Sequence, residues 1–265
     1  MDCSLTSLIR VVSLLWIIGA NSWADTLHAP DGKHLNIEQQ GIKQACPVLK
    51  LAGGEWLSWT DLMATPSGTG NSLRLIKLIR ENLPLTIQET GAAPFTRQLR
   101  QLQDSHVDVM FGLYPTGDRL KNFEFTDSFF LEALYVYSAK ELAEKEWRLE
   151  DLKHYRGIAV RGSSYGEDIN TLINTHPKQW TMVGRYIQAI TMVAAGRADF
   201  LIGSKVSSDL KKTEASVYRS AKPVAWQPVA AAFTKNSPCA GWIPAINHLI
   251  QQHMQGFVKP ESQQH

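Results

Sequence analysis

The sequence predicts an α/β protein built from two units, each a parallel sheet covered by helices. Strand-like and helix-like segments alternate over residues 48–111 with short connections, and a second alternation occupies residues 157–233. This pattern is typical of parallel sheets whose crossover helices pack on the sheet faces. Between the two alternations, residues 140–151 are highly charged, look helical and lack a deep apolar face, which indicates a domain boundary.

Residues 1–24 predict a secretory signal peptide. The apolar run at residues 11–20 follows Arg10 and is shorter than the roughly 20 apolar residues that a membrane helix needs. Ser22 and Ala24 place small residues where signal peptidase requires them, so cleavage is expected after Ala24. A buried N-terminal helix is the alternative. Residues 25–46 are polar and predict a poorly ordered leader, and no later segment is apolar enough for a membrane helix, so we expect a soluble, exported protein.

The first unit is predicted from apolar spacing. Leu75, Ile76 and Ile79 recur at helical intervals after Asn71 or Ser72, either of which can cap a helix. The expected elements are a strand at 48–52, a helix from 71 or 72 to 83, a strand at 85–88, a helix over 95–102 and a strand at 107–111.

The second unit follows a long aromatic strand at 129–137 and the charged boundary. Its last helix carries an apolar face at Ile243, Ile246, Leu249 and Ile250. The expected elements are a strand at 157–160, helices at 165–173 and 186–195, strands at 198–202 and 224–233, and the last helix at 241–254.

Ligands of open α/β sheets bind beyond the carboxyl ends of the strands. Four loops occupy those ends, at residues 53–59, 112–119, 161–165 and 203–206, and we expect them to line one cleft.

Each of these loops holds side chains with two possible roles. Arg119 offers a planar fork of donors suited to a carboxylate, and its alternative role is a surface ion pair with Asp118 or Asp127. Trp56 either stacks on a ligand or closes the rim of the core. Ser164 and Glu167 have the spacing of a capping box, and a helix N-terminus at this point can also bind an anion.

Composition and motifs weigh against several other classes of function. The 27 basic and 25 acidic residues leave a net charge of +2, far from the basic balance of a nucleic-acid-binding protein. The sequence contains no G-x-S-x-G elbow, Walker loop or H-E-x-x-H motif, which argues against hydrolases and nucleotide enzymes. Cys46 and Cys239 lack His or Cys neighbours at zinc spacing, so we expect no metal and no cofactor. These two cysteines either form a disulfide or remain as buried thiols.

The segment VDVMFGLYPTGDRLKNFEFTDSFF, at residues 107–130, resembles the signature of the family 3 periplasmic solute-binding proteins, the polar amino-acid type that serves ABC transporters. That signature has an acidic residue before the strand, Thr-x-x-Arg after it and Phe-Ser/Thr-Asp beyond. Asp108, Thr116, Arg119 and residues 125–127 match it. The resemblance covers nearly the whole mature chain.

The resemblance implies the two-lobed periplasmic-binding-protein fold of type II, with two parallel or mixed sheets joined by two crossing strands near residues 131–138 and 224–233. Lobe 1 would comprise residues 25–136 and 225–265, and lobe 2 residues 137–224. Arg119 would grip the carboxylate of the ligand. The implied ligand contacts are Trp56, Tyr114, Thr116, Arg119, Ser163, Ser164 and Ser204.

The chain departs from this family at two places. Ser204 stands where amino-acid binders carry an aspartate for the α-ammonium of the ligand, and Leu57 and Ser58 replace two prolines. A buried ammonium without a counter-charge is costly. Either Glu55 or Glu167 supplies that charge, or the ligand lacks an amine.

The resemblance predicts a binding protein rather than an enzyme. We expect a periplasmic monomer that captures a small carboxylate-bearing ligand, an amino acid or a related organic acid, for an inner-membrane ABC permease. Two alternatives are a sensor-type module that signals to a partner and a dehydratase-like enzyme on the same fold, with Glu55 or Glu167 as the acid.

Overall fold

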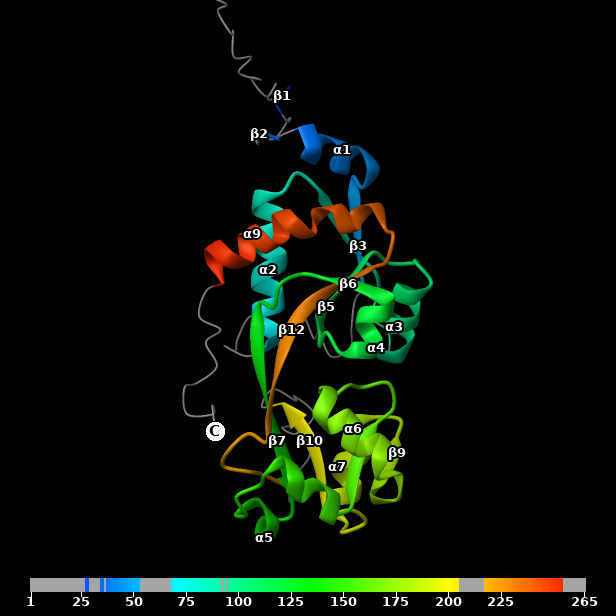
Figure 1. Ribbon diagram of the computed structural model, residues 1–265, viewed down its shortest axis with the longest axis vertical. Coiled ribbons are helices and arrows are strands. Elements are labelled where there is room, and N and C mark those ends of the chain that lie inside the picture. Colours follow the sequence, from blue (N-terminus) through cyan, green and yellow to red (C-terminus); the bar gives the residue numbers. More distant parts are fainter. Residues whose placement is uncertain are drawn as a thin grey trace, which may run out of the picture.

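The computed structural model describes residues 27–28, 34–35, 37–52, 68–91, 93, 95–204 and 217–254. Two lobes lie one beyond the other along the long axis of the molecule (Figure 1). Strands β7 (Phe130–Ser138) and β12 (Ala225–Thr234) run side by side from one lobe to the other. The predicted crossing strands near residues 131–138 and 224–233 are therefore present.

One continuous path of strands links the lobes, in the order β4-β3-β5-β12-β7-β10-β8-β9. The strands at each end of this path are parallel, whereas β12 and β7 in the middle pair antiparallel with each other and with their outer neighbours. In the first lobe the strands are β3 (Val48–Leu51), β4 (Thr86–Glu89), β5 (Val109–Leu113) and β6 (Phe123–Phe125). In the second lobe they are β8 (Gly157–Val160), β9 (Trp180–Val183), β10 (Phe200–Ser204) and β11 (Tyr218–Arg219). Strands β1 (Leu27–His28) and β2 (His34–Leu35) pair separately.

Helices cover both faces of the first-lobe sheet. Ile79 of one helix and Ile246 of another pack with Phe111 and Trp242 in the larger cluster, and Leu102 packs on the opposite face. These side chains are buried because their apolar spacing turns one face of each helix toward the sheet. The helical elements are α1 (Ile37–Ala45), α2 (Gly68–Asn82), α3 (Phe95–Gln103), α4 (Gly117–Asn122), η3 (Pro238–Trp242) and α9 (Ile243–His253).

The second lobe has an aromatic core. The rings of Trp180 and Phe200 meet edge to face with their centroids 5.2 Å apart, and Trp147 joins them on the same side. Ile190 and Val193 fill the other side of the sheet. The helical elements of this lobe are α5 (Lys140–Ala143), η1 (Leu149–His154), α6 (Glu167–Thr175), η2 (Pro177–Gln179) and α7 (Tyr186–Ala194).

Cys46 and Cys239 form a disulfide, which decides between the two alternatives that the sequence left open. Cys46 immediately precedes β3, and Cys239 lies in η3 shortly after β12. The bridge therefore ties the beginning of the first-lobe sheet to the C-terminal segment of the chain.

Several predictions about elements are wrong or incomplete. The helix expected to begin at Asn71 or Ser72 begins at Gly68, so neither residue caps it. Residues 37–45 form α1 rather than an irregular leader, and β9 was not predicted. The charged stretch at 140–151 is not one helix, because it holds α5 and only the beginning of η1. The predicted signal peptide lies outside the described residues, and the residue bounds of the lobes stay a prediction. No helix in the described ranges is long and apolar enough to span a bilayer.

Candidate functional site

The turn that follows β5 directs Arg119 inward. Thr116 has an extended backbone (φ −84°, ψ 160°) immediately before α4, and its N–H donates to the Tyr114 carbonyl at 2.9 Å. The Thr116 carbonyl accepts the N–H of Leu120 at 2.9 Å. This tight reversal places Arg119 in the first turn of a short helix, with its side chain directed at the protein rather than at solvent.

Arg119 is buried, with 9% of its surface exposed. Its Nη1 donates to the main-chain carbonyl of Tyr114 at 3.3 Å, and its Cζ lies 5.7 Å from the centre of the Phe95 ring. Among the described residues, no carboxylate lies within ion-pair distance of it, and burial lowers the pKa of Arg119 to about 10. A buried guanidinium with one neutral acceptor is arranged to receive an anion.

The surface ion pair that the sequence offered as an alternative for Arg119 does not form. Asp118 pairs with Lys121, with 3.0 Å between Oδ1 and Nζ. Asp127 accepts a hydrogen bond from Gln251 at 3.0 Å. Both aspartates are therefore engaged elsewhere on the surface.

The loop after β8 brings the second lobe against the first. The N–H of Gly117 in α4 donates to Oε2 of Glu167 in α6 at 3.2 Å. A Cβ on Gly162 would lie 2.5 Å from Cγ2 of Thr96 in α3, so the Thr96 side chain packs closely against the backbone of Gly162. Two separate points on this loop and helix thus touch the first lobe.

The predicted capping box at the beginning of α6 is wrong. The helix begins at Glu167 with Gly166 as its N-cap, so Ser164 lies two residues too early to cap it. The Ser164 hydroxyl accepts instead from the side chain of Asn170 at 2.8 Å and from the N–H of Gly166 at 3.4 Å. The exposed Ser163 hydrogen-bonds through its hydroxyl to Tyr165. Both serines therefore have partners within the loop.

Glu132 is the site residue that sequence reasoning missed. Its carboxylate, on crossing strand β7, accepts a hydrogen bond from the Tyr114 hydroxyl of the first lobe and from the Ser204 hydroxyl of the second lobe. Burial raises the pKa of Glu132 and raises that of Tyr114 well above the usual range. The Tyr137 hydroxyl donates to the Ser204 carbonyl at 3.0 Å and holds the end of β10 in place.

Comparison with known proteins rests on structure. No protein-family model matches the chain, and no curated protein sequence matches it either. A histidine kinase sensor domain with similarity to periplasmic binding proteins matches 82% of this chain and all of that domain, with 16% identity and a TM-score of 0.62. An ancestral arginine-binding protein bound to arginine matches 78% of this chain and 92% of its own, with 16% identity and a TM-score of 0.59. An amino-acid ABC transporter substrate-binding protein from Streptococcus pneumoniae bound to L-arginine matches 80% and 91%, with 18% identity and a TM-score of 0.59.

The chain has the two-lobed fold of the periplasmic binding proteins. Within this periplasmic-binding-protein fold, the structure brings part of the predicted site together. Tyr114, Thr116 and Arg119 share one turn, and Ser204 reaches that turn through Glu132. Ser163 and Ser164 lie in the loop that touches the first lobe near Thr96. Trp56 lies outside the described residues, as do Glu55, Leu57 and Ser58.

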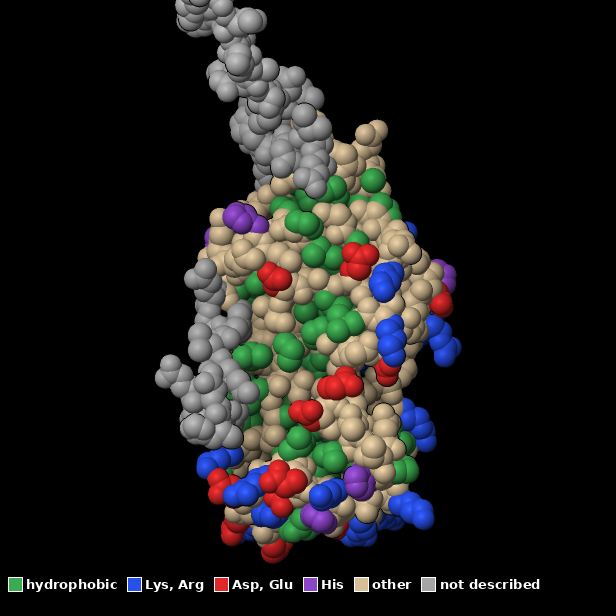
Figure 2. Space-filling model, viewed as in Figure 1, with side chains coloured by type: hydrophobic (Ala, Val, Ile, Leu, Met, Phe, Trp, Pro, Cys, Tyr) green, Lys and Arg blue, Asp and Glu red, His purple; other side chains and the backbone are tan. Residues whose placement is uncertain are grey.

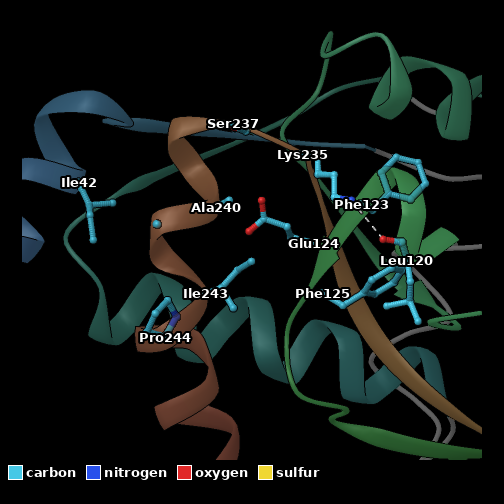
Figure 3. A pocket seen from close by; sticks show the side chains of 11 residues that line it. Ile42, Leu120, Phe123, Glu124, Phe125, Lys235, Ser237, Ala240, Ile243 and Pro244 are labelled. Atoms are coloured by element: carbon cyan, nitrogen blue, oxygen red, sulfur yellow. Dashed lines mark hydrogen bonds between the residues drawn. The ribbon is translucent and has the colours of Figure 1, made fainter. Parts of the chain in front are cut away.

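A hollow lies on the outside of the first lobe (Figure 3). Its volume is about 790 Å³, and its walls come from α1, α4, β6, η3 and α9. The ammonium of Lys235 is held there by the main-chain carbonyls of Lys121 and Leu120, at 2.7 and 3.4 Å. Because only first-lobe elements line this hollow, a ligand in it would not contact both lobes.

The second lobe carries a group of charged side chains on its surface (Figure 2). Figure 2 shows lysine and arginine side chains mixed with acidic ones at the far end of the second lobe. In the same lobe, Arg156 forms an ion pair with the partly buried Asp199 at 2.7 Å. This pair gives Asp199 a structural role next to β10.

Proposed function

We propose that this protein is an exported solute-binding protein that holds a small carboxylate-bearing ligand, an amino acid or a related organic acid, between its lobes. The observation that carries the proposal is the buried guanidinium of Arg119, which has no carboxylate partner among the described residues. Leaving such a charge unpaired costs several kcal/mol, of order 3–5 when a buried pair is broken. A ligand carboxylate would offset that cost with two parallel hydrogen bonds.

The proposed mechanism is binding coupled to lobe closure. The contacts of Gly117 with Glu167 and of Thr96 with Gly162 form only when the lobes meet. A ligand held by both lobes would favour that closed arrangement, by as much as its affinity for the closed form exceeds its affinity for the open one. The proposed ligand contacts are Trp56, Tyr114, Thr116, Arg119, Ser163, Ser164 and Ser204.

We further propose that the protein acts as a monomer in the periplasm, after cleavage of the signal peptide at Ala24, and delivers its ligand to an inner-membrane ABC permease. Structures of ABC transporter substrate-binding proteins among the neighbours support this role. Mass spectrometry of the small molecules that co-purify with protein taken from the periplasm would identify the ligand.

Replacing Arg119 with alanine tests the proposal. We expect Arg119→Ala to weaken binding of the co-purified ligand at least about a hundredfold, because a buried charge-assisted pair is lost. Isothermal titration calorimetry measures the affinity, and circular dichroism checks that the variant is folded.

The matched control is Arg100→Ala, which removes an exposed arginine from the same lobe. This variant should bind with the affinity of the wild type. Equal affinity of the wild type and Arg119→Ala would contradict the proposal.

A sensor-type module is the second candidate function, favoured by the likeness to a whole histidine kinase sensor domain. Deleting the protein should abolish uptake of the radiolabelled ligand by cells if it serves a transporter. If it is a sensor, uptake should persist while the transcriptional response to the ligand disappears. Recovery of chemically unchanged ligand after incubation would exclude the dehydratase alternative.

A further inference from the structure

Three elements that are distant in sequence converge on the carboxylate of Glu132. The Tyr114 hydroxyl comes from the turn after β5, and the Ser204 hydroxyl comes from the end of β10. Glu132 itself lies in β7, opposite Gln227 of β12 in the strand register. The carboxylate therefore sits where the two lobes and the two crossing strands meet.

The residues around Glu132 are closely packed. The side-chain amide of Gln227 lies over Gly166, where a Cβ would be 2.1 Å from its atoms. Only the absence of a side chain at Gly166 allows the second-lobe loop to approach β12 so closely. Gln227 and Glu132 are thus held side by side at the junction.

Both known partners of Glu132 are neutral hydroxyls. No ion pair to Glu132 forms within the described part of the chain, although other carboxylates of the second lobe, such as Asp151 and Asp199, have lysine or arginine partners. Hydroxyl donors offset part of the cost of burying a carboxylate, and a cation would offset more. Among the described residues, Glu132 is thus an acidic group without a counter-charge, as Arg119 is a cation without one.

Tyr114 forms hydrogen bonds to both Arg119 and Glu132. Arg119 hydrogen-bonds to the main-chain carbonyl of Tyr114, whereas Glu132 hydrogen-bonds to the hydroxyl at the other end of the same residue. One tyrosine residue therefore links the guanidinium and the carboxylate. An α-amino acid carries the two complementary charges, a carboxylate and an ammonium, on one small molecule.

We propose that Glu132 binds the ammonium group of the ligand and so restricts the ligand to amino acids rather than simple organic acids. The inference rests on the proposed function, because it requires Arg119 to hold the carboxylate of the same molecule. It also places the counter-charge on a crossing strand rather than on Glu167. Glu167 is already engaged with Gly117 of the other lobe.

The experiment compares amino acids with analogues that lack the amine. The twenty proteinogenic L-amino acids are titrated into the protein by calorimetry, together with the 2-hydroxy acid that matches each binder. L-Arginine and L-glutamine are the first probes. We expect the wild type to prefer the amino acid over its 2-hydroxy acid at least about thirtyfold, as expected when a buried charge loses its partner.

Glu132→Gln removes the charge and keeps the shape. It should lower the affinity for the amino acid at least about thirtyfold and leave the 2-hydroxy acid nearly unaffected. Glu124→Gln, the same change on an exposed strand of the first lobe, is the matched control and should alter neither affinity. Adding Ser204→Asp to Glu132→Gln returns a carboxylate next to position 132 and should restore at least part of the preference.

The outcomes separate this inference from the proposed function. Equal binding of amino acid and 2-hydroxy acid, with both lost in Arg119→Ala, would overturn the role of Glu132 and leave the carboxylate site standing. Unchanged amino-acid affinity in Glu132→Gln would overturn it as well. If no amino acid binds to the wild type and Arg119→Ala has no effect on the co-purified ligand, both proposals fail.

Discussion

Arg119 and Glu132 carry opposite charges, yet the fold keeps them at the two ends of Tyr114 instead of pairing them. In a poorly solvated junction, a direct ion pair would be the less costly arrangement for the protein alone. Keeping the two charges apart lowers the free energy of unfolding of the ligand-free protein. This is the arrangement expected of a site that binds a molecule with both charges.

Removing the charge of Glu132 should therefore stabilise the ligand-free protein. Burial raises the pKa of Glu132 above its ordinary value of 4.5, so the folded state favours the protonated form. The contribution of Glu132 to the free energy of unfolding is fully present below the ordinary pKa of 4.5. It is lost as the pH rises through the raised pKa of the folded state. At pH 7 we expect Glu132→Gln to raise the free energy of unfolding by about 1–2 kcal/mol, measured by urea denaturation.

The pH dependence provides the control for this prediction. Below pH 4 the carboxyl is protonated in both states, and the difference between the variant and the wild type should disappear. Glu124→Gln, at an exposed position, should show no such difference at either pH. A variant less stable than the wild type at pH 7 would show that Glu132 contributes to stability, contrary to this prediction.

At the scale of elements, apolar spacing predicted most of the strands and helices that carry the site. The strand at 157–160 was predicted with the bounds observed for β8, and those at 129–137 and 224–233 differ from β7 and β12 by one residue at each end. Of the four loops predicted from strand ends, those at 112–119 and 161–165 contact the opposite lobe, because parallel strands share one direction, whereas the loop at 53–59 lies outside the described residues. The order of the elements was therefore readable from the sequence.

The errors have physical causes in tertiary contacts. Glu132 was missed because the run at 129–137 reads as uniformly apolar and aromatic, and only pairing with β12 fixes which side chains face the junction. The capping box at Ser164 failed because Gly166, with a φ of +89°, is the N-cap of α6 and delays the beginning of the helix to Glu167. The helix α1 was missed because its stability comes from packing against η3 rather than from a strong apolar stripe of its own.

Gly166 allows a direct test of the junction at this scale. Its φ of +89° is unfavourable for any residue with a Cβ, and the amide of Gln227 occupies the space that a Cβ would need. The Gln227 side chain can swing away, so backbone strain sets the minimum cost. We expect Gly166→Ala to destabilise the protein by about 1–3 kcal/mol in urea denaturation.

Gly184→Ala is the matched control in the same lobe, because no atom lies within 4 Å of a Cβ at Gly184. This variant should be as stable as the wild type within about 0.5 kcal/mol. Similar losses in both variants would mean that the contact between Gly166 and Gln227 has no special role.

For the whole molecule, the Cys46–Cys239 disulfide should stabilise folding without affecting ligand binding. It joins residues 193 positions apart in the sequence, so it strongly restricts the unfolded chain. We expect replacement of both cysteines with alanine to lower the free energy of unfolding by about 2–5 kcal/mol, measured by urea denaturation.

Ligand affinity is the second measurement on the same variant. Cys46 and Cys239 lie beside α1 and η3, at the end of the first lobe that is remote from the second (Figure 1). The affinity measured by calorimetry should therefore change less than about threefold. A large loss of affinity in a folded variant would mean that the bridge controls the position of the lobes.

The position of β12 in the sheet also governs the order in which the chain can fold. This strand is the last in the sequence, yet it lies between β5 and β7 in the middle of the strand order. Until residues 225–234 have been synthesised, one edge of β5 has no partner strand. The first-lobe strands are then not yet joined to β7 and the second-lobe strands by hydrogen bonds. Strands β8, β9 and β10 pair with each other and β10 pairs with β7, while β3 pairs with β4 and β5, so each group of strands can form before β12 is available. The edges of β5 and β7 that pair with β12 stay exposed until residues 225–234 are synthesised, and unpaired strand edges of this kind promote aggregation during folding.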